Sequence, residues 1–280
     1  MKVTFCGVRG TAPASGPEFN EFGGHTTAVL VHGRDGEAVC IDAGTGAIDA
    51  GRILDSGGGP SSLLLLVTHC HLDHIMGLGV FSPLHGPDWR VRFAAPRRDG
   101  PSVRDGITKI LDEPYWPVRL AGMAATIEWV DLSDGAPAPY LHGGLQVRWC
   151  AVRHNGVCTA YRLDEPATGA SLVFATDMEW GRSTDTEKAA FLRFCAEPSP
   201  ARLLVIDGQY TRETYTEHRG WGHGTVEEAA EIAGEARVGR LLVTHHAPDR
   251  TDALLRLVEA RLAELAPNAG LARQGMIVEV

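Results

Sequence analysis

Three histidines and one aspartate stand within the six-residue segment 69–74, which reads His-Cys-His-Leu-Asp-His. Imidazole nitrogens and carboxylate oxygens are ligands for Zn²⁺ and similar divalent metals. The segment follows the apolar run 62–67, which is typical of a buried strand. A tight turn after a strand lets the side chains point in two directions, His69 and His71 in one, Asp73 and His74 in the other. The spacing therefore predicts a metal site, and it suits two adjacent metals better than one.

Other polar side chains stand where apolar stretches end further along the chain. Four of them can bind a metal or transfer a proton: His154, Asp177, Asp207 and His245. The predicted strands that they follow span 145–153, 172–176, 203–206 and 241–244. Because they all stand at strand ends, we expect these side chains and the segment 69–74 to form a single site at one edge of the sheets.

The remaining segments alternate between strand and helix patterns. Further strands are predicted at 2–6, 26–32, 37–42, 62–67, 90–94, 157–163 and 276–280. Helices are predicted after 46, from 75, and at 103–111, 186–195, 226–236 and 252–265. The segment 57–60, Gly-Gly-Gly-Pro, predicts a plain loop before the metal-site strand. No repeat, low-complexity tract or interdomain linker divides the chain, which predicts one α/β domain spanning 1–280.

Charge and composition narrow the classes of partner. A net charge of −9 argues against a surface built for broad nucleic-acid contact, because such binding relies on Lys and Arg that neutralise phosphates. Extended nucleic-acid binding is therefore not expected, whereas a small phosphodiester held by metals is compatible. The chain shows no secretory signal and no apolar run long enough to span a membrane. We expect a cytoplasmic protein with no membrane partner.

The six cysteines contain no CxxC pair, and several fall within predicted buried strands. Reduced thiols in the core are expected rather than disulfides, in keeping with a cytoplasmic protein. Cys70 stands between two candidate ligands, but the alternation of the loop is expected to turn its side chain away from the metals.

The constellation resembles the metallo-β-lactamase superfamily, whose αββα sandwich carries an HxHxDH motif and later His, Asp and His ligands. The resemblance covers nearly the whole chain. It is closest to the phosphodiesterase branch, which includes ribonuclease Z and bacterial cyclic-nucleotide phosphodiesterases. The segments that carry this finer resemblance are 7–13 (GVRGTAP), 23–26 (GGHT), 207–210 (DGQY), 220–225 (GWGHGT) and 244–248 (THHAP). Three positions differ from the branch: His25 where Asn is common, Asp207 where ribonuclease Z has Glu, and Gly224 where Ser is usual.

The resemblance implies a division of labour among the metal ligands. One metal would be bound by His69, His71 and His154, the second by Asp73, His74 and His245, with Asp177 bridging. We expect two divalent ions, with Zn²⁺ first and Mn²⁺ or Fe as alternatives. Two cations roughly 3.5–4 Å apart can hold a bridging hydroxide and clamp a phosphoryl oxygen. His246 competes with its neighbour for one ligand role, and the position directly after the strand favours His245.

His223 stands in a Gly-rich loop before a predicted helix, where backbone N–H groups and an imidazole can both meet an anion. We expect it to donate a proton or hydrogen bond to the phosphoryl or leaving oxygen, with Asp207 orienting the ring. The alternative is a loop histidine with no role. With Asp73, these two residues are the candidate catalytic residues.

Three functions remain open: a phosphodiesterase for small cyclic nucleotides, a ribonuclease Z-like tRNA 3′-processing endonuclease, and a metal-stabilised sensor without turnover. By resemblance, ribonuclease Z carries a long tRNA-binding arm between the strand-end His and the bridging Asp. Here only 22 residues, 155–176, lie between these positions. We therefore predict hydrolysis of cyclic nucleotides to linear monophosphates, 3′,5′ rather than 2′,3′.

The segment 113–118 places Tyr115 and Trp116 between two prolines. These aromatic residues are expected either to pack beneath a surface loop, or to form a pocket wall or a subunit contact. As a pocket wall, they could receive the base of a nucleotide substrate. Related phosphodiesterases are commonly homodimers, so the resemblance implies a homodimer here.

Overall fold

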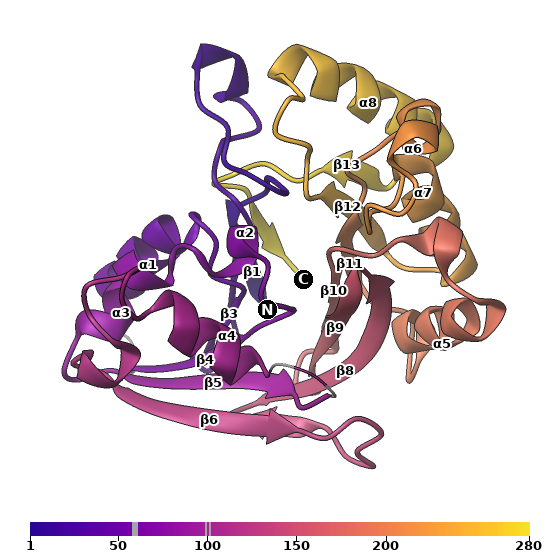
Figure 1. The fold of residues 1–280 in the computed structure, drawn as a ribbon. Coiled ribbons are helices and arrows are strands. Elements are labelled where there is room, and N and C mark those ends of the chain that lie inside the picture. The colour runs from indigo at the N-terminus through magenta and orange to yellow at the C-terminus, as the bar shows by residue number, and fades with distance from the viewer. Residues whose placement is uncertain (58–60, 99, 101) are drawn as a thin grey trace.

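Two seven-stranded mixed sheets pack face to face in the computed structural model, and helices cover the outer face of each (Figure 1). The structure describes residues 1–57, 61–98, 100 and 102–280, so most of the predicted loop 57–60 lies outside the described residues. The chain forms six strands of one sheet, then all seven strands of the other, and its last strand returns to the first sheet. The predicted αββα sandwich and single domain are confirmed.

The first sheet has the strand order β14-β1-β2-β3-β4-β5-β6. Strands β3 to β6 run parallel to one another, whereas β14, β1, β2 and β3 pair antiparallel. The bounds are Ile277–Glu279 (β14), Lys2–Gly7 (β1), Ala28–His32 (β2), Ala38–Ile41 (β3), Ser62–Leu66 (β4), Arg90–Pro96 (β5) and Thr126–Leu132 (β6).

The second sheet has the order β13-β12-β11-β10-β9-β8-β7. Strands β10 to β13 are parallel, and β7 to β10 are antiparallel. The bounds are Ala269–Leu271 (β13), Arg240–Thr244 (β12), Leu203–Asp207 (β11), Ala170–Ala175 (β10), Gly156–Glu165 (β9), Leu145–His154 (β8) and Tyr140–His142 (β7).

The helices fall into two groups according to the sheet that they cover. Against the first sheet and its loops lie α1 (Ala47–Ser56), α2 (Leu72–Ile75), α3 (Ser82–His85) and α4 (Val103–Ile110). Against the second lie α5 (Asp185–Ala196), α7 (Val226–Glu235) and α8 (Asp252–Leu265), while α6 (Arg212–His218) has no buried residue and lies beside α7, where Arg212 N donates to Glu227 Oε2. Short 3₁₀ turns span Pro17–Phe19, Leu78–Val80, Leu120–Gly122 and Trp180–Arg182.

The alternation of side chains along a strand explains the three apolar layers. In β4, Leu64 and Leu66 face the other sheet, whereas Leu63 and Leu65 face the helices α1, α3 and α4. In β10, Leu172 and Phe174 likewise belong to the layer between the sheets, and Val173 packs under the helices. A strand buried on both faces reads as a continuous apolar run, which is why the sequence identified these strands.

The sequence analysis did not predict three of the strands: β6, β7 and β13. β6 lies at a sheet edge and is mostly half-buried, while β7 and β13 have three residues each, so none shows a strong apolar pattern.

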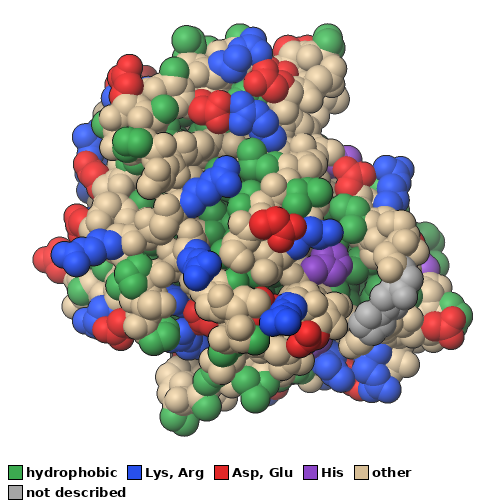
Figure 2. Space-filling model, turned by 180° about the vertical axis from the view of Figure 1, so that it is seen from behind, with side chains coloured by type: hydrophobic (Ala, Val, Ile, Leu, Met, Phe, Trp, Pro, Cys, Tyr) green, Lys and Arg blue, Asp and Glu red, His purple; other side chains and the backbone are tan. Residues whose placement is uncertain are grey.

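The six cysteines are free thiols, as predicted. Among the described residues, no helix is both long and apolar enough to cross a membrane. On the face in Figure 2, acidic and basic side chains are interspersed among apolar ones.

Candidate metal centre

The seven predicted ligands converge at the edge where the parallel strands of both sheets end. The loop after β4 and helix α2 carry His69, His71, Asp73 and His74. From the second sheet, His154 ends β8, while Asp177 and His245 follow β10 and β12. Ligands of open α/β sheets commonly bind outside the carboxyl ends of the strands. The structure thus brings all seven side chains together, and their metal-binding role is our proposal.

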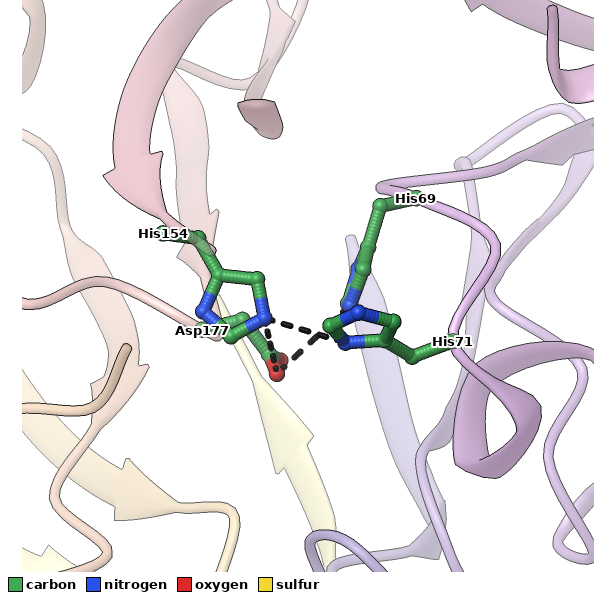
Figure 3. A group of neighbouring side chains, drawn as sticks. All are labelled: His69, His71, His154 and Asp177. Carbon is green, nitrogen blue, oxygen red and sulfur yellow. Dashed lines mark hydrogen bonds and ion pairs between the residues drawn. The ribbon is translucent and has the colours of Figure 1, made fainter. Parts of the chain in front are cut away.

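The first group comprises His69, His71, His154 and Asp177. Figure 3 shows the two loop imidazoles facing His154 and Asp177 across a shared centre. His71 Nδ1 lies 3.0 Å from His154 Nε2, and Asp177 Oδ1 lies 3.7 Å from Nε2 of both His154 and His69. Tetrahedral Zn²⁺ with bonds of 2.0–2.1 Å places its ligand atoms about 3.3 Å apart. The donor atoms are therefore spaced for one common ion.

The second group comprises Asp73, His74, His245 and the same Asp177. His74 Nε2 lies 3.0 Å from Asp177 Oδ2 and 3.3 Å from His245 Nε2. His245 Nε2 lies 3.2 Å from an oxygen of each carboxylate. The two groups use different oxygens of Asp177, which is the arrangement expected of a bridging carboxylate.

Hydrogen bonds on the far side of the rings fix which nitrogen faces the centre. His154 Nδ1 donates to Gly222 O at 2.7 Å, and His74 Nδ1 donates to Asp42 Oδ2 at 2.7 Å. His245 Nδ1 donates to Gln209 Oε1 at 2.9 Å. Such outer partners fix the tautomer and leave the Nε2 lone pair for a metal.

Buried acceptors without hydrogen-bond partners also favour a cation. Within the described part of the chain, His69 Nε2 and Asp177 Oδ2 are buried and have no such partner. An unpaired buried polar group is destabilising, and a divalent ion between lone pairs that otherwise repel would remove this cost. The donor set therefore fits two divalent ions.

The backbone is strained at this edge of the sheets. Asp177, Asp42 and His245 have φ angles of 56°, 60° and 65°, respectively, which non-glycine residues seldom adopt. Strain of this kind persists where the surroundings hold it, commonly at functional sites. Asp177 and His245 contribute ligand atoms to the centre, whereas Asp42 bonds the outer nitrogen of His74.

Two glycines permit loops to approach the ligand rings closely. A Cβ atom on Gly10 would collide with the ring of His245, and one on Gly222 with the ring of His154. Gly222 also has a φ of 94°, a value that favours glycine. This close approach explains why glycine stands at position 10 of the segment 7–13 and at position 222 of the segment 220–225.

The charge states of the first group's imidazoles and of the carboxylates match those of metal ligands, whereas His74 holds a proton that a metal would replace. Burial of the His69 and His154 rings, and partial desolvation of the more exposed His71 ring, lower their pKa values, which favours the neutral rings that bind metals. Burial opposes ionisation of Asp73, but His74 and His245 hold the pKa of this carboxyl well below its usual range. Burial also opposes protonation of His74, yet the carboxylates around it raise its pKa well above normal. In the second group the carboxyls of Asp73 and Asp177 are therefore ionised, and a divalent ion would take the place of the proton that they favour on His74.

His223 and Asp207 lie beside this centre as a hydrogen-bonded pair. His223 Nδ1 donates to Asp207 Oδ2 at 2.8 Å, and the His223 ring stacks on that of His245 with centroids 4.9 Å apart. Burial disfavours the imidazolium, but Asp207 outweighs it and raises the pKa of His223 to about 9. Asp207 Oδ2 also accepts the backbone N–H of Asp177 at 2.9 Å. The pair can hold a proton near the metals.

The structure adds supporting residues that the sequence analysis missed. Asp42 ends the predicted strand 37–42, the same signal that identified the other strand-end residues, and it bonds His74. Gln209 and Thr11 lie in the segments 207–210 and 7–13 that carry the family resemblance, but no role was assigned to them. In the structure, Thr11 N donates to Asp73 Oδ2 at 2.7 Å. His246 lies away from the centre, where its Nε2 bonds Ala272 O at 2.8 Å, and burial lowers its pKa to about 3.

The comparisons with known proteins agree with this geometry. The model of the Beta-lactamase superfamily domain matches residues 38–246, and the chain belongs to this family. A ribonuclease Z of Bradyrhizobium diazoefficiens is 26% identical over 320 residues and covers 96% of each chain. Two solved structures share the metallo-β-lactamase fold. One is the metallo-β-lactamase fold protein YhfI of Bacillus subtilis, with a TM-score of 0.70 and 18% identity, in a match that covers 100% of this chain and 98% of that one. The other is the short form of human tRNase Z, with a TM-score of 0.69 and 17% identity, in a match that covers 100% of this chain and 99% of that one. These findings support a metal-dependent hydrolase.

One prediction is corrected by these relatives. Extended nucleic-acid binding was not expected from the net charge, but a relative that matches nearly the whole chain is named ribonuclease Z. A net charge of −9 averages over the entire surface, whereas nucleic-acid contact depends on where Lys and Arg gather and on bound cations. Net charge therefore does not exclude this class of substrate.

Proposed function

We propose that the protein is a binuclear metal-dependent phosphodiesterase. The observation that carries this proposal is the pair of ligand groups that share Asp177 and adjoin the His223–Asp207 pair. A purely structural metal site closes its coordination with protein ligands, whereas a catalytic one keeps a position for water or substrate. His71 is exposed, while the other six ligands are buried, so the centre opens on one side.

Each part of the site has a distinct task in this proposal. Two divalent ions, when bound, supply an activated nucleophile and a clamp for phosphoryl oxygens. The chain fixes the ligand rings through Asp42, Gly222 and Gln209. Because Asp207 occupies Nδ1 of His223, the Nε2–H of this ring remains to donate to the phosphoryl or leaving oxygen.

For the substrate, we propose small cyclic nucleotides, with 3′,5′ diesters preferred. Supporting this choice, the segment between His154 and Asp177 is filled by β9, a short turn and β10. Residues 156–165 and 170–175 pair as a hairpin, so the chain between the two ligands belongs to the sheet rather than to a projecting arm. Both Zn²⁺ and Mn²⁺ suit the donor set.

A second candidate is endonucleolytic processing of tRNA 3′ ends. The observation that favours it is the similarity to ribonuclease Z along 96% of the chain. Both candidates use the same metal centre and the same proton donor, so they differ in what lies beyond the phosphodiester. A metal-stabilised binding module without turnover is the third possibility.

A substrate panel separates the candidates. Purified protein loaded with Zn²⁺ or Mn²⁺ is incubated with 3′,5′- and 2′,3′-cyclic nucleotides and with a 3′-extended pre-tRNA, and the products are resolved by chromatography and gel. We expect linear monophosphates from the 3′,5′ compounds. Cleavage of pre-tRNA without turnover of any cyclic nucleotide would establish the second candidate. A fall of each activity in His223→Ala, prepared in the same way, excludes a contaminating enzyme. Inactivity of the metal-loaded wild type on all substrates would reject both enzymes.

A further inference from the structure

A cavity of about 510 Å³ adjoins the loop that carries His223. Its wall includes three aromatic rings from α6 and the loops on either side of it. The rings of Tyr210 and His218 stack with centroids 4.5 Å apart and an interplanar angle of 20°, and Trp221 meets His218 edge-on at 4.9 Å. Trp221 is 59% exposed, which is unusual for a side chain of this size. The cavity therefore offers a flat, partly exposed π surface.

The cavity lies beside the candidate metal centre, because three of its wall residues contact residues of the site. The Tyr210 ring lies 6.1 Å from that of His223, measured between centroids. Two further wall residues hold metal-ligand candidates: Gln209 Oε1 accepts from His245, and Thr11 N donates to Asp73. A group bound here is thus one side chain away from a phosphodiester at the centre.

Polar groups accompany the aromatic wall. Arg250 is half-buried at the cavity, where its Nη2 donates to Thr214 Oγ1 at 3.1 Å, and the exposed Asp249 lies beside it. A guanidinium and a carboxylate can bond acceptors and donors on the edge of a nucleobase. Stacking by aromatic side chains accepts any base, because every base has a π face.

We infer that this cavity is the subsite for the base of a nucleotide whose phosphodiester lies at the metal centre. The inference rests on the proposed function, since it needs a phosphodiester there. It holds for a cyclic nucleotide and for a nucleotide within a chain alike. Trp221 provides the exposed stacking surface, and the Tyr210–His218 stack supports it from the side of His223.

The aromatic segment 113–118 forms a different cavity, of about 480 Å³, on the other side of the metal loop. Its wall includes Cys70, whose Sγ points to Val103 O of α4 at 3.7 Å, and so away from the ligand atoms. Trp116 packs closely against Gly79, and a Cβ there would collide with its ring. The segment thus packs against the core and lines a cavity. From the segment 69–74, this cavity is lined by Cys70 and Leu72, which lie between the candidate ligands in sequence.

A binding measurement tests the subsite without any need for turnover. Affinities of AMP and of ribose 5-phosphate, which differ only in the base, are measured by calorimetry with metal-loaded protein. We expect the wild type to bind AMP more tightly. Trp221→Ala should lower the AMP affinity by roughly 5- to 150-fold, the range found for base–aromatic stacking, and leave ribose 5-phosphate unchanged. Trp221→Phe should retain most of the preference.

Tyr115→Ala is the matched control, because Tyr115 is 66% exposed and lines the other cavity. It should keep the wild-type ratio of the two affinities. Equal binding of AMP and ribose 5-phosphate by the wild type would overturn the inference. So would an unchanged ratio in Trp221→Ala, or a loss of the preference in Tyr115→Ala instead. A base preference without hydrolysis of any diester would contradict the proposed function but not the subsite.

Discussion

Asp42 and His74 are joined by a hydrogen bond of 2.7 Å, and the same carboxylate reaches the other metal group through Thr68. Thr68 Oγ1 donates to Asp42 Oδ2 at 2.8 Å and lies 3.1 Å from His69 Nδ1. One buried carboxylate therefore orients an imidazole of each ligand group. The two candidate metal sites share Asp177 on the inside and Asp42 on the outside.

Asp42→Ala should weaken metal binding at both groups, because it releases the rings of His74 and His69 together. Outer partners of this kind typically contribute 10- to 100-fold in metal affinity. Competition with a chromogenic chelator measures the loss, and circular dichroism checks the fold. Asp55→Asn, at an exposed aspartate of α1, is the control and should bind as the wild type does. Loss of one ion with full retention of the other would contradict the shared role.

Two divalent ions should bind per chain. Metal analysis after purification without chelator is expected to give a stoichiometry near two, and Asp177→Ala should reduce both sites because its two oxygens face different groups. His71→Ala should affect mainly the first group, to which this ring belongs. A reproducible stoichiometry of one or none in the wild type would refute the binuclear centre.

His223→Ala should retain its metals and fold but lose turnover by about 10²- to 10⁴-fold, as is typical of acid–base residues. Asp207→Asn should have a smaller effect on turnover if the carboxylate only orients and charges the imidazole. Steady-state kinetics on the best substrate of the panel gives both values. Turnover of His223→Ala at the wild-type rate would remove this residue from the mechanism.

The position of the candidate site could be predicted from the sequence better than its surroundings. The candidate ligands follow strongly apolar strands, so their convergence at one edge could be inferred from the pattern alone. Asp42 also stands at the end of a predicted strand, but its role could not be predicted, because it depends on contact with His74, which is 32 residues away in sequence. The three edge or very short strands lack an apolar run, and the aromatic cavity beside Trp221 is formed by segments that are distant in sequence.

The homodimer stays a prediction, because the structure contains one chain.

Gly222→Ala should damage the first metal group, because a Cβ would collide with the His154 ring and Gly222 O fixes its Nδ1. Metal affinity is the measured quantity, and a loss of 10-fold or more is expected. Gly220→Ala is a close control: its φ is 93° against 94°, but its Cβ would meet only the end of Arg182. Equal losses in both variants would assign the effect to backbone strain instead of the collision.

Glu165 should make the stability of the fold depend on pH, far from the metal centre. Burial alone would raise its pKa, but the Thr168 hydroxyl, at 2.5 Å, and the N–H of Arg34, at 2.6 Å, hold it below its usual range. A depressed pKa in the folded state stabilises the protein above the unfolded pKa of about 4.5, and this contribution is lost as the pH falls through the folded value. Glu165→Gln should therefore lower the free energy of unfolding at pH 7 by on the order of 1 kcal/mol. The melting temperatures of variant and wild type are compared in the presence of chelator, and their difference should shrink as the pH falls below about 4.5. A difference that stays constant down to pH 3 would show that the charge of Glu165 does not contribute to stability.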